Sequence, residues 1–332
     1  MAGYGDDLSA LGIATAPDGG VFVSGRVEST TGAIQFTNGL EGAMRFPPAD
    51  PREVDSDGFL AAFEADGSAR WLRVFGTAGS DTPAEVTVAG DIVALAHWPS
   101  IGPMIFDAEQ PGGTLEMTGS AISTWDAKDG TFREATSIGT PTSALTVGVA
   151  AGGTDRLISV TEGVRDRTYG EGDGQITWSG ALTHGLVTAW SASGLAWQAN
   201  QLLDTNPAGG AVRGYWVDAR HDGWSVTSGF VAGEATFATS PPRTVPAASV
   251  GTSGGDGFVG LVDPSFALQC AYWMPGPDVE DVRAALDEAG GIAVVGDFTH
   301  SITFEPGTPR EVTLTGESDG FVAYFAPPVA PP

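Results

Sequence analysis

The sequence predicts an all-β protein, a five-bladed β-propeller with four antiparallel strands in each blade. Three observations lead to this prediction. The 332 residues include 48 glycines and 22 prolines, spread along the whole chain, and this punctuation is typical of many short strands joined by turns. No long run of helical periodicity is present. One pattern of strands and turns recurs five times at nearly regular intervals.

Each repeat begins with two apolar strands joined by a tight turn that contains glycine or aspartate. The second strands end near residues 25, 96, 161, 229 and 296, so the intervals are 71, 65, 68 and 67 residues. Repeats of this length indicate an array in which each unit packs on its neighbours. We therefore expect residues 1–326 to form a single domain. The paired strands are expected at 8–16 and 21–25, 85–88 and 92–96, 145–150 and 157–161, 215–218 and 224–229, and 283–286 and 292–296.

The third strands carry a signature of their own. Asp57-Gly58-Phe59, Asp256-Gly257-Phe258 and Asp319-Gly320-Phe321 open three of them, and the Asp-Gly pair turns the chain before each strand. Degenerate versions begin at Ser120 and His184. Fourth strands are expected at 71–75, 131–138, 195–203 and 268–273.

The fifth repeat lacks a fourth strand of its own. After Phe325 the chain continues only as a proline-rich tail, 327–332, which is typical of a linker. Tyr4-Gly5 aligns with Phe75-Gly76 at the end of a fourth strand. We therefore expect the N-terminal strand to complete the last blade and close the ring, which would leave no sheet edge exposed. So short a piece of strand predicts further residues upstream.

Several phrases of the sequence resemble SBBP-type bacterial β-propeller repeats. They are residues 12–25, 66–76 and 318–325. The resemblance extends over nearly the whole chain, strongly in the first, fourth and fifth repeats and weakly in the second and third. It implies the propeller fold and commonly an exported or cell-surface protein. It implies no activity, because a fold is not a function.

The charge is strongly acidic, with 41 acidic residues against 15 basic ones and a net charge of −26. A field of this sign repels nucleic acid and anionic membrane surfaces, and it attracts cations and basic partners. Solubility alone is the simpler explanation. No apolar run reaches the length of a membrane span, and no signal peptide is visible at the start of this chain. The single cysteine, Cys270, excludes an internal disulfide.

Binding is expected on the connections between second and third strands. These connections are long at 26–56, 97–119 and 230–255, and long loops on a rigid scaffold are the usual place for binding. The blade-to-blade connections on the same face are acidic. Their carboxylates at a channel mouth would hold a cation or cleave a glycosidic bond, or would simply lie in solvated turns. The residues are Asp6, Asp7, Asp81, Asp278, Glu280 and Asp281.

Two arginines and two tryptophans complete the predicted binding residues. Arg213 and Arg283 lie on innermost strands of adjacent repeats, where they would bind a carboxylate or phosphate or form structural salt bridges. Trp98, Trp178 and a further aromatic residue, Tyr169, lie in or beside loops and would stack on sugar rings or proline, although packing within the loops explains them equally well.

Other motifs fail on context. Residues 251–255 fit G-x-S-x-G but open into a strand rather than a helix. The four histidines occupy four different positions of the repeat, so they are not expected to share a metal. Residues 55–58 hint at a calcium loop but lack the later ligands. The sequence therefore predicts no catalytic residue and no cofactor, with calcium the one weak alternative.

The leading hypothesis is a non-catalytic binding or scaffolding module, exported or surface-associated, that holds a protein or a glycan on its loop-rich face. A carbohydrate-active enzyme is the first alternative, and it requires carboxylates about 5 to 10 Å apart at the channel mouth. A structural spacer within a larger surface assembly is the second. Ligand, compartment and oligomeric state do not follow from the sequence.

Overall fold

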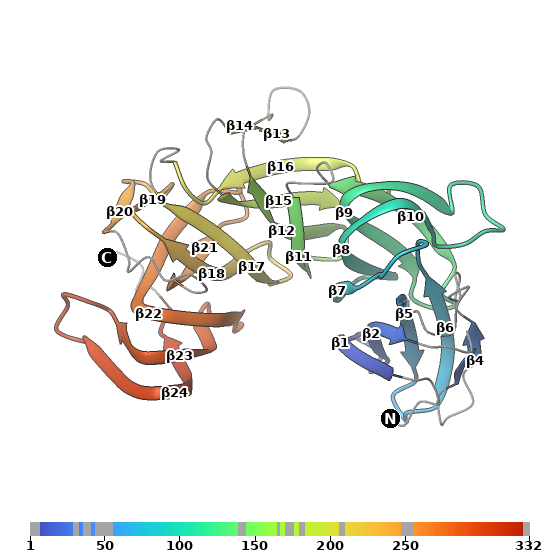
Figure 1. Ribbon diagram of the computed structural model, residues 1–332, viewed down its shortest axis with the longest axis horizontal. Coiled ribbons are helices and arrows are strands. Elements are labelled where there is room, and N and C mark those ends of the chain that lie inside the picture. The colour runs from blue at the N-terminus through green and yellow to red at the C-terminus, as the bar shows by residue number, and fades with distance from the viewer. Residues whose placement is uncertain are drawn as a thin grey trace. The chain divides into compact units, whose positions relative to one another are not determined.

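The computed structural model describes strands and turns and, in the described residues, no helix (Figure 1). The all-β prediction is therefore confirmed. The chain divides into two compact units, residues 1–149 with 191–196 and residues 150–190 with 197–332. The described residues are 7–28, 33–35, 41–43, 56–138, 144–164, 167–169, 176–178, 183–205, 210–246 and 255–327.

Two four-stranded antiparallel sheets make up most of the first unit. In each, the strand order follows the predicted order of the repeat. A short ladder, β3 (Ala33–Gln35) with β4 (Glu41–Ala43), lies in the connection between β2 and β5. The first sheet contains β1 (Asp7–Thr15), β2 (Val21–Glu28), β5 (Ser56–Phe63) and β6 (Ala69–Phe75). The second contains β7 (Pro83–Ala89), β8 (Ile92–Ile105), β9 (Thr114–Asp126) and β10 (Phe132–Ile138).

The third sheet begins at the division between the units, and the remaining strands lie in the second unit. Short ladders again occupy the connections between second and third strands. The third sheet contains β11 (Ala144–Ala151), β12 (Arg156–Val164), β15 (Thr183–Ser191) and β16 (Trp197–Leu202). A six-stranded sheet contains β17 (Ala211–Ala219), β18 (Ser225–Ala232), β21 (Gly255–Val262), β22 (Leu268–Leu286), β23 (Ile292–Phe304) and β24 (Val312–Phe325). The ladders are β13 (Arg167–Tyr169) with β14 (Ile176–Trp178), and β19 (Ala235–Phe237) with β20 (Arg243–Val245).

Strand β22 belongs to two repeats at once. Its first part, from Leu268 to Met274, pairs with β21 as the fourth strand of the fourth repeat. Its second part, from Asp278 to Leu286, pairs with β23 as the first strand of the fifth repeat. The six-stranded sheet is therefore two consecutive repeats. The strand predicted to complete the fifth repeat, around Tyr4-Gly5, lies outside the described residues.

The first strands share a bulge opposite the end of the second strand. The register shifts between Ala10 and Gly12 in β1, between Gly214 and Trp216 in β17, and between Glu280 and Arg283 in β22. A bulge adds one or two residues to one strand of a pair and re-aims their side chains. Its recurrence supports the predicted repeat, and it sets the direction of side chains such as that of Tyr215.

The core of the first unit is aromatic. Phe75, Phe106, Trp125 and Phe132 are buried and form a chain of ring contacts, with Phe106 and Phe132 stacked at 5.1 Å. His97 enters this group edge-on to Phe75, with ring centroids 5.0 Å apart. Large rings that meet in this way contribute more than their buried area alone. They hold the outer strand of the first sheet against the second.

The predicted loop at 97–119 is wrong. Strand β8 continues to Ile105 and pairs with β9 from Thr114, so this segment is a hairpin closed by a short turn. Met104 and Met117 are buried on it, which explains why it stays ordered despite Pro99 and Pro103. Strands β23 and β24 likewise extend into a hairpin, from Phe304 and Val312 inward. Part of 230–255 forms the β19–β20 ladder, and most of 26–56 lies outside the described residues.

Candidate ligand sites

The two predicted acidic residues of the first unit have opposite environments. Asp7 begins β1 and is exposed to solvent. Asp81 is fully buried. Its carboxylate accepts a hydrogen bond from the Thr77 backbone N–H at 2.5 Å and another from the Ser100 hydroxyl at 2.8 Å. The solvated-turn alternative is therefore wrong for Asp81, which is a structural acceptor in the connection between the first two sheets.

A second buried carboxylate lies beside Asp81. Asp57, from the predicted third-strand signature, is also fully buried. Both carboxylates approach Gly76: a Cβ built there would lie 2.1 Å from Asp57 Oδ1 and 3.2 Å from Asp81 Oδ2. Only glycine fits between them. In the described ranges no three His, Cys, Asp or Glu side chains gather in a way that could hold a metal ion.

The two predicted tryptophans lie on strands rather than in loops. Trp98 falls at a register shift of β8 and its side chain is 48% exposed. Its backbone N–H donates to the Thr82 carbonyl at 3.0 Å. Trp178 ends β14 opposite Arg167, and its side chain lies outside what the structure describes. Trp98 is thus accessible for stacking.

Arg213 is held by a buried partner. Its Nε lies 3.4 Å from Glu162 Oε1, and its guanidinium lies over the Phe230 ring at 5.2 Å. Burial raises the pKa of the Glu162 carboxyl, with Arg213 acting in the opposite direction. Burial also raises the pKa of Tyr215, the bulge residue beside them. Arg213 therefore forms a structural salt bridge, one of the two roles that the sequence predicts for it.

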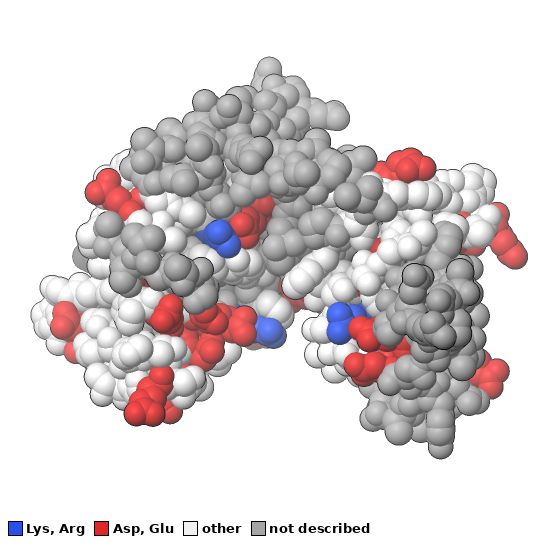
Figure 2. Space-filling model, in the orientation of Figure 1, with Lys and Arg blue, Asp and Glu red and all other residues white. Residues whose placement is uncertain are grey.

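The remaining predicted residues gather on β22. Arg283 lies 4.6 Å from the centroid of the Trp216 ring. Glu280 and Asp281 are exposed, and Glu280 stands opposite Asp297 on β23. The pKa of Glu280 is raised first by partial burial and then by the charges of Asp297, Asp278 and Asp281. These carboxylates therefore lie close enough to repel one another. On the face drawn in Figure 2, acidic side chains outnumber basic ones, as the composition requires.

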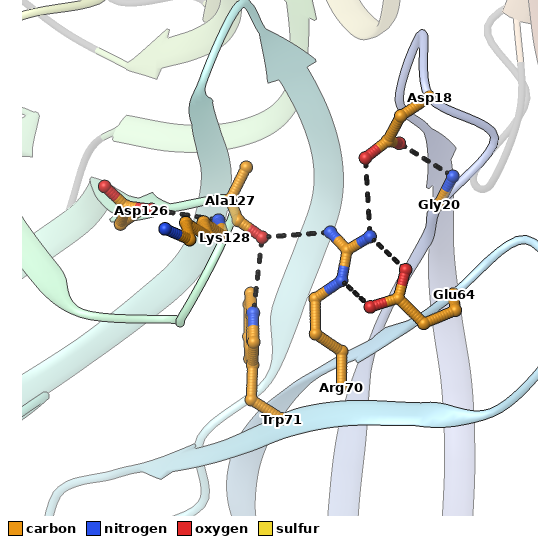
Figure 3. Close-up of polar contacts among 8 residues, drawn as sticks. All are labelled: Asp18, Gly20, Glu64, Arg70, Trp71, Asp126, Ala127 and Lys128. Atoms are coloured by element: carbon orange, nitrogen blue, oxygen red, sulfur yellow. Dashed lines mark hydrogen bonds and ion pairs between the residues drawn. The ribbon is translucent and has the colours of Figure 1, made fainter.

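One cavity, in the first unit, lies among the tight turns and encloses about 600 Å³. We call it the Arg70 cavity. Arg70 belongs to its lining, and Figure 3 shows the Arg70 guanidinium between Asp18, Glu64 and the Ala127 carbonyl. Nε and Nη2 contact the two oxygens of Glu64 at 2.9 and 2.7 Å, and Nη2 also contacts Asp18 at 3.4 Å. Its lining residues are Ala16, Pro17, Asp18, Glu64, Arg70, Gly90, Asp91, Ala127 and Lys128.

The contacts of Arg70 join the first sheet to the second. Nη1 of Arg70 and the indole N–H of Trp71 both donate to the Ala127 carbonyl at 3.3 Å (Figure 3). Arg73 donates to the Gly130 carbonyl at 2.7 Å in the same turn. The hydrogen bonds that Arg70 donates to Glu64 raise the pKa of Arg70, so the guanidinium remains charged. The guanidinium is thus occupied by protein partners, and the cavity is a structural joint.

A second cavity, in the second unit, has different chemistry. It encloses about 380 Å³ and is bordered by two connections between second and third strands, at Arg243 and at 305–310. We call it the Arg243 cavity. Three aromatic residues contribute to it, and Tyr272 stacks on Phe325 with ring centroids 4.5 Å apart. Its lining residues are Arg243, Tyr272, Trp273, Glu305, Pro306, Thr308, Pro309, Arg310 and Phe325.

The polar groups of the Arg243 cavity are only partly occupied. Arg243 Nη1 donates to the Ala271 carbonyl at 2.5 Å, and the Trp273 indole N–H donates to Asp256 at 2.7 Å. In the described part of the chain no carboxylate lies within ion-pairing distance of Arg243 or Arg310. Burial raises the pKa of Tyr272 to about 12, so its phenol remains protonated. The cavity therefore offers donors and aromatic surface to a ligand.

The residues of the Arg243 cavity were not among those predicted. A signal for them exists in the repeat. Arg243 follows Gly229 by 14 residues, and Arg310 follows Gly296 by the same 14. Both stand in a Pro-Arg-x-Val sequence, ending at Val245 and at Val312. Two arginines at one repeat position are notable in a chain with so few basic residues.

Comparisons with known proteins leave the chain without a family. No family model matches it, and no curated protein matches its sequence. Its structure is similar to that of a protein of unknown function from Dyadobacter fermentans DSM 18053, with 10% identity and a TM-score of 0.46. The likeness covers 93% of this chain and 83% of that one. Across the ranges that the structure describes, no helix is both long and apolar enough to cross a bilayer.

Proposed function

We propose that the chain is a non-catalytic binding module that holds a glycan or a protein segment on its second-to-third connections. The observation that carries this proposal is the Arg243 cavity, where two such connections border aromatic side chains. Pockets of a few hundred cubic ångströms with aromatic walls and a few polar groups are the usual form of a ligand site. Glu305 is the sole carboxylate of its lining, whereas glycoside hydrolysis uses a pair.

The test is a glycan array probed with labelled protein. We expect specific binding by the wild type and its loss in Tyr272→Leu, which removes the stacked phenol from the cavity. Trp98→Leu is the matched control, because Trp98 is an exposed aromatic residue in the other unit. Thermal unfolding of both variants separates loss of binding from loss of folding. Equal binding by wild type and Tyr272→Leu, or binding lost only in Trp98→Leu, would remove the cavity from the proposal.

A carbohydrate-active enzyme is the second candidate, favoured by one observation. Partial burial, followed by the charges of three neighbouring carboxylates, raises the pKa of Glu280, and a raised pKa is what a general acid requires. Hydrolysis of polysaccharide substrates by the wild type, abolished in Glu280→Gln, would establish this function. Activity that survives in Glu280→Gln, or no activity in the wild type, would reject it.

We further propose that the five repeats are the blades of a closed ring. Both terminal repeats present apolar side chains to solvent: Ile13 on β1 is 72% exposed and Val322 on β24 is 83% exposed. Leu11 and Tyr324 accompany them on the same two strands. Contiguous exposed apolar surface marks a face that packs against something. Ring closure would cover both faces with each other.

Aspartate substitutions test the closure. In a closed ring, Ile13→Asp and Val322→Asp would each lower the free energy of unfolding by roughly 2 kcal/mol, because a charge would replace a packed apolar group. Val312→Asp, on the extended arm of the β23–β24 hairpin, is the control. If Ile13→Asp and Val322→Asp each change the free energy of unfolding by less than about 0.5 kcal/mol, as is usual for exposed sites, closure is contradicted.

The resemblance to exported bacterial repeats makes a secreted or cell-surface location part of this proposal. Labelling of intact cells with an antibody against the chain tests it. Labelling that requires lysis would contradict the proposed location.

A further inference from the structure

The basic residues of this chain are few, and most of those described are occupied by the protein itself. Arg70, Arg133, Arg213 and Arg220 each form an ion pair with a carboxylate. Arg73 and Arg156 instead donate to carbonyl oxygens, and Arg283 lies over the Trp216 ring. Arg243 and Arg310 also lack a carboxylate within ion-pairing distance in the described ranges, and they differ from the others because both border one cavity. Two guanidinium groups at one opening form a local positive site on an acidic protein.

The charge of the whole chain limits what this site can attract. A net charge of −26 repels polyanions such as nucleic acid or heavily sulfated chains. Two arginines within hydrogen-bonding reach of a ligand nevertheless favour a carboxylate, which their planar donors match in geometry. The combination selects a ligand that is neutral except for a single carboxylate.

The rest of the lining suits a sugar ring. Tyr272 and Trp273 supply aromatic surface on which the apolar face of a pyranose can lie. Glu305 in the same lining is an acceptor for the hydroxyl groups of the ring. A cavity of about 380 Å³ has room for one or two sugar residues.

We propose that the Arg243 cavity binds a sugar residue that carries one carboxylate, such as a uronic acid at the end of a glycan. This inference rests on the proposed binding function and names its ligand class. Arg243 and Arg310 contact the carboxylate, while the aromatic residues and Glu305 contact the ring. The neutral sugar of the same shape binds more weakly, because it leaves the arginines without an anion.

Isothermal titration calorimetry with a matched pair of ligands tests the inference. The probes are a disaccharide that ends in glucuronic acid and the same disaccharide that ends in glucose. We expect the wild type to prefer the acidic sugar at least tenfold, or about 1.4 kcal/mol. Arg310→Gln and Arg243→Gln lose most of that preference and keep the weak binding of the neutral sugar. Lys128→Gln removes the same charge in the other unit and keeps the preference.

The outcomes separate the two proposals. Equal affinity for the two sugars overturns the carboxylate inference and leaves glycan binding in place. If Lys128→Gln lowers the preference for the acidic sugar as much as the arginine variants do, the effect comes from the net charge of the protein, and the carboxylate inference is also overturned. A free-carboxylate peptide ending in tryptophan serves as a third probe. If it binds and neither sugar does, a peptide is the ligand and the sugar inference is overturned. Absence of binding to all three probes overturns the proposed function at this cavity as well.

Discussion

The Arg70 cavity and the Arg243 cavity both place a guanidinium beside a carboxylate-bearing side chain, yet they differ in what the guanidinium contacts. Arg70 is bound by Glu64, Asp18 and the Ala127 carbonyl. Arg243 contacts one backbone carbonyl, and Glu305, in the same lining, is beyond ion-pairing distance. The larger of the two cavities is therefore the poorer candidate for a ligand.

The difference shows that a candidate ligand site is better recognised by polar groups without protein partners than by the volume of its cavity. In the first unit the described polar side chains of Asp81 and Arg70 are used to hold two sheets together, and His97 is paired with Ser123 inside the second sheet. In the Arg243 cavity they remain available. Removing a polar group should therefore cost stability in the first unit and affinity in the second.

Asp81 should give the largest effect on stability. Asp81→Ala leaves the Thr77 N–H and the Ser100 hydroxyl buried without their acceptor. We expect the free energy of unfolding to fall by about 3 kcal/mol, as is usual for a disrupted buried network. Urea denaturation measures it. Asp7→Ala removes the same charge from an exposed position and should change stability by less than about 0.5 kcal/mol. Similar losses in the two variants would mean that Asp81 is not a structural acceptor.

His97 should make the first unit sensitive to acid. Burial lowers its pKa to about 3, so the unfolded chain binds a proton at His97 below about pH 6.5 and the folded chain does not. Stability from this group is therefore complete above about pH 6.5 and is lost as the pH falls towards 3. At pH 4.5 the loss should be about 2 to 3 kcal/mol.

The comparison with His97→Gln isolates this effect. Burial raises the pKa values of Asp218 and Asp256, and a raised carboxyl pKa stabilises the folded state as the pH falls. The measured quantity is therefore the difference between wild type and variant in unfolding free energy from pH 7 to 4.5. His221→Gln removes a histidine from an exposed turn and is the control variant. A His97→Gln slope equal to that of the wild type would show that His97 does not control the acid response.

Arg70 should contribute less than either buried group. Arg70→Lys keeps the charge but loses the paired contact with Glu64 and the bond to the Ala127 carbonyl. We expect a loss of about 1 kcal/mol that shrinks as salt is added. Arg26→Lys, in an exposed pair with Glu28, is the control and should lose less. If the two variants behave alike, the Arg70 cluster is an ordinary surface ion pair.

The strands were predictable because their signals are local. The turn at Asp18-Gly19 lies between apolar residues, and the structure has strands on both sides of it. The turn predicted at Asp57-Gly58 is wrong, because both residues pair with β2 inside strand β5. The long hairpin of β8 and β9 was missed because Pro99, Gly102 and Pro103 indicate a loop. Burial of Met104 and Met117 against the aromatic core overrides that indication.

The Arg243 cavity is bordered by two second-to-third connections, the segments on which binding was predicted, but none of the predicted residues lines it. The acidic residues were chosen from the blade-to-blade connections and the two arginines from first strands. Arg243 and Tyr272 come together only through the packing of β20 on β22, which the sequence does not display. The sequence does show that Arg243 and Arg310 share one repeat position. That position points to a ligand site only when the structure shows that neither arginine has a carboxylate partner in the described residues.

Arg310 should have the smallest effect on stability, so it contrasts most strongly with Arg70. Its side chain is exposed and makes no hydrogen bond within the described residues. Arg310→Gln should therefore leave the free energy of unfolding within about 0.5 kcal/mol of the wild-type value. Because the variant is expected to keep the stability of the wild type, any loss of acidic-sugar binding reports the loss of a contact with the ligand rather than a loss of folding. A loss of stability like that of Arg70→Lys would place Arg310 in a structural joint, and the two cavities would then be alike.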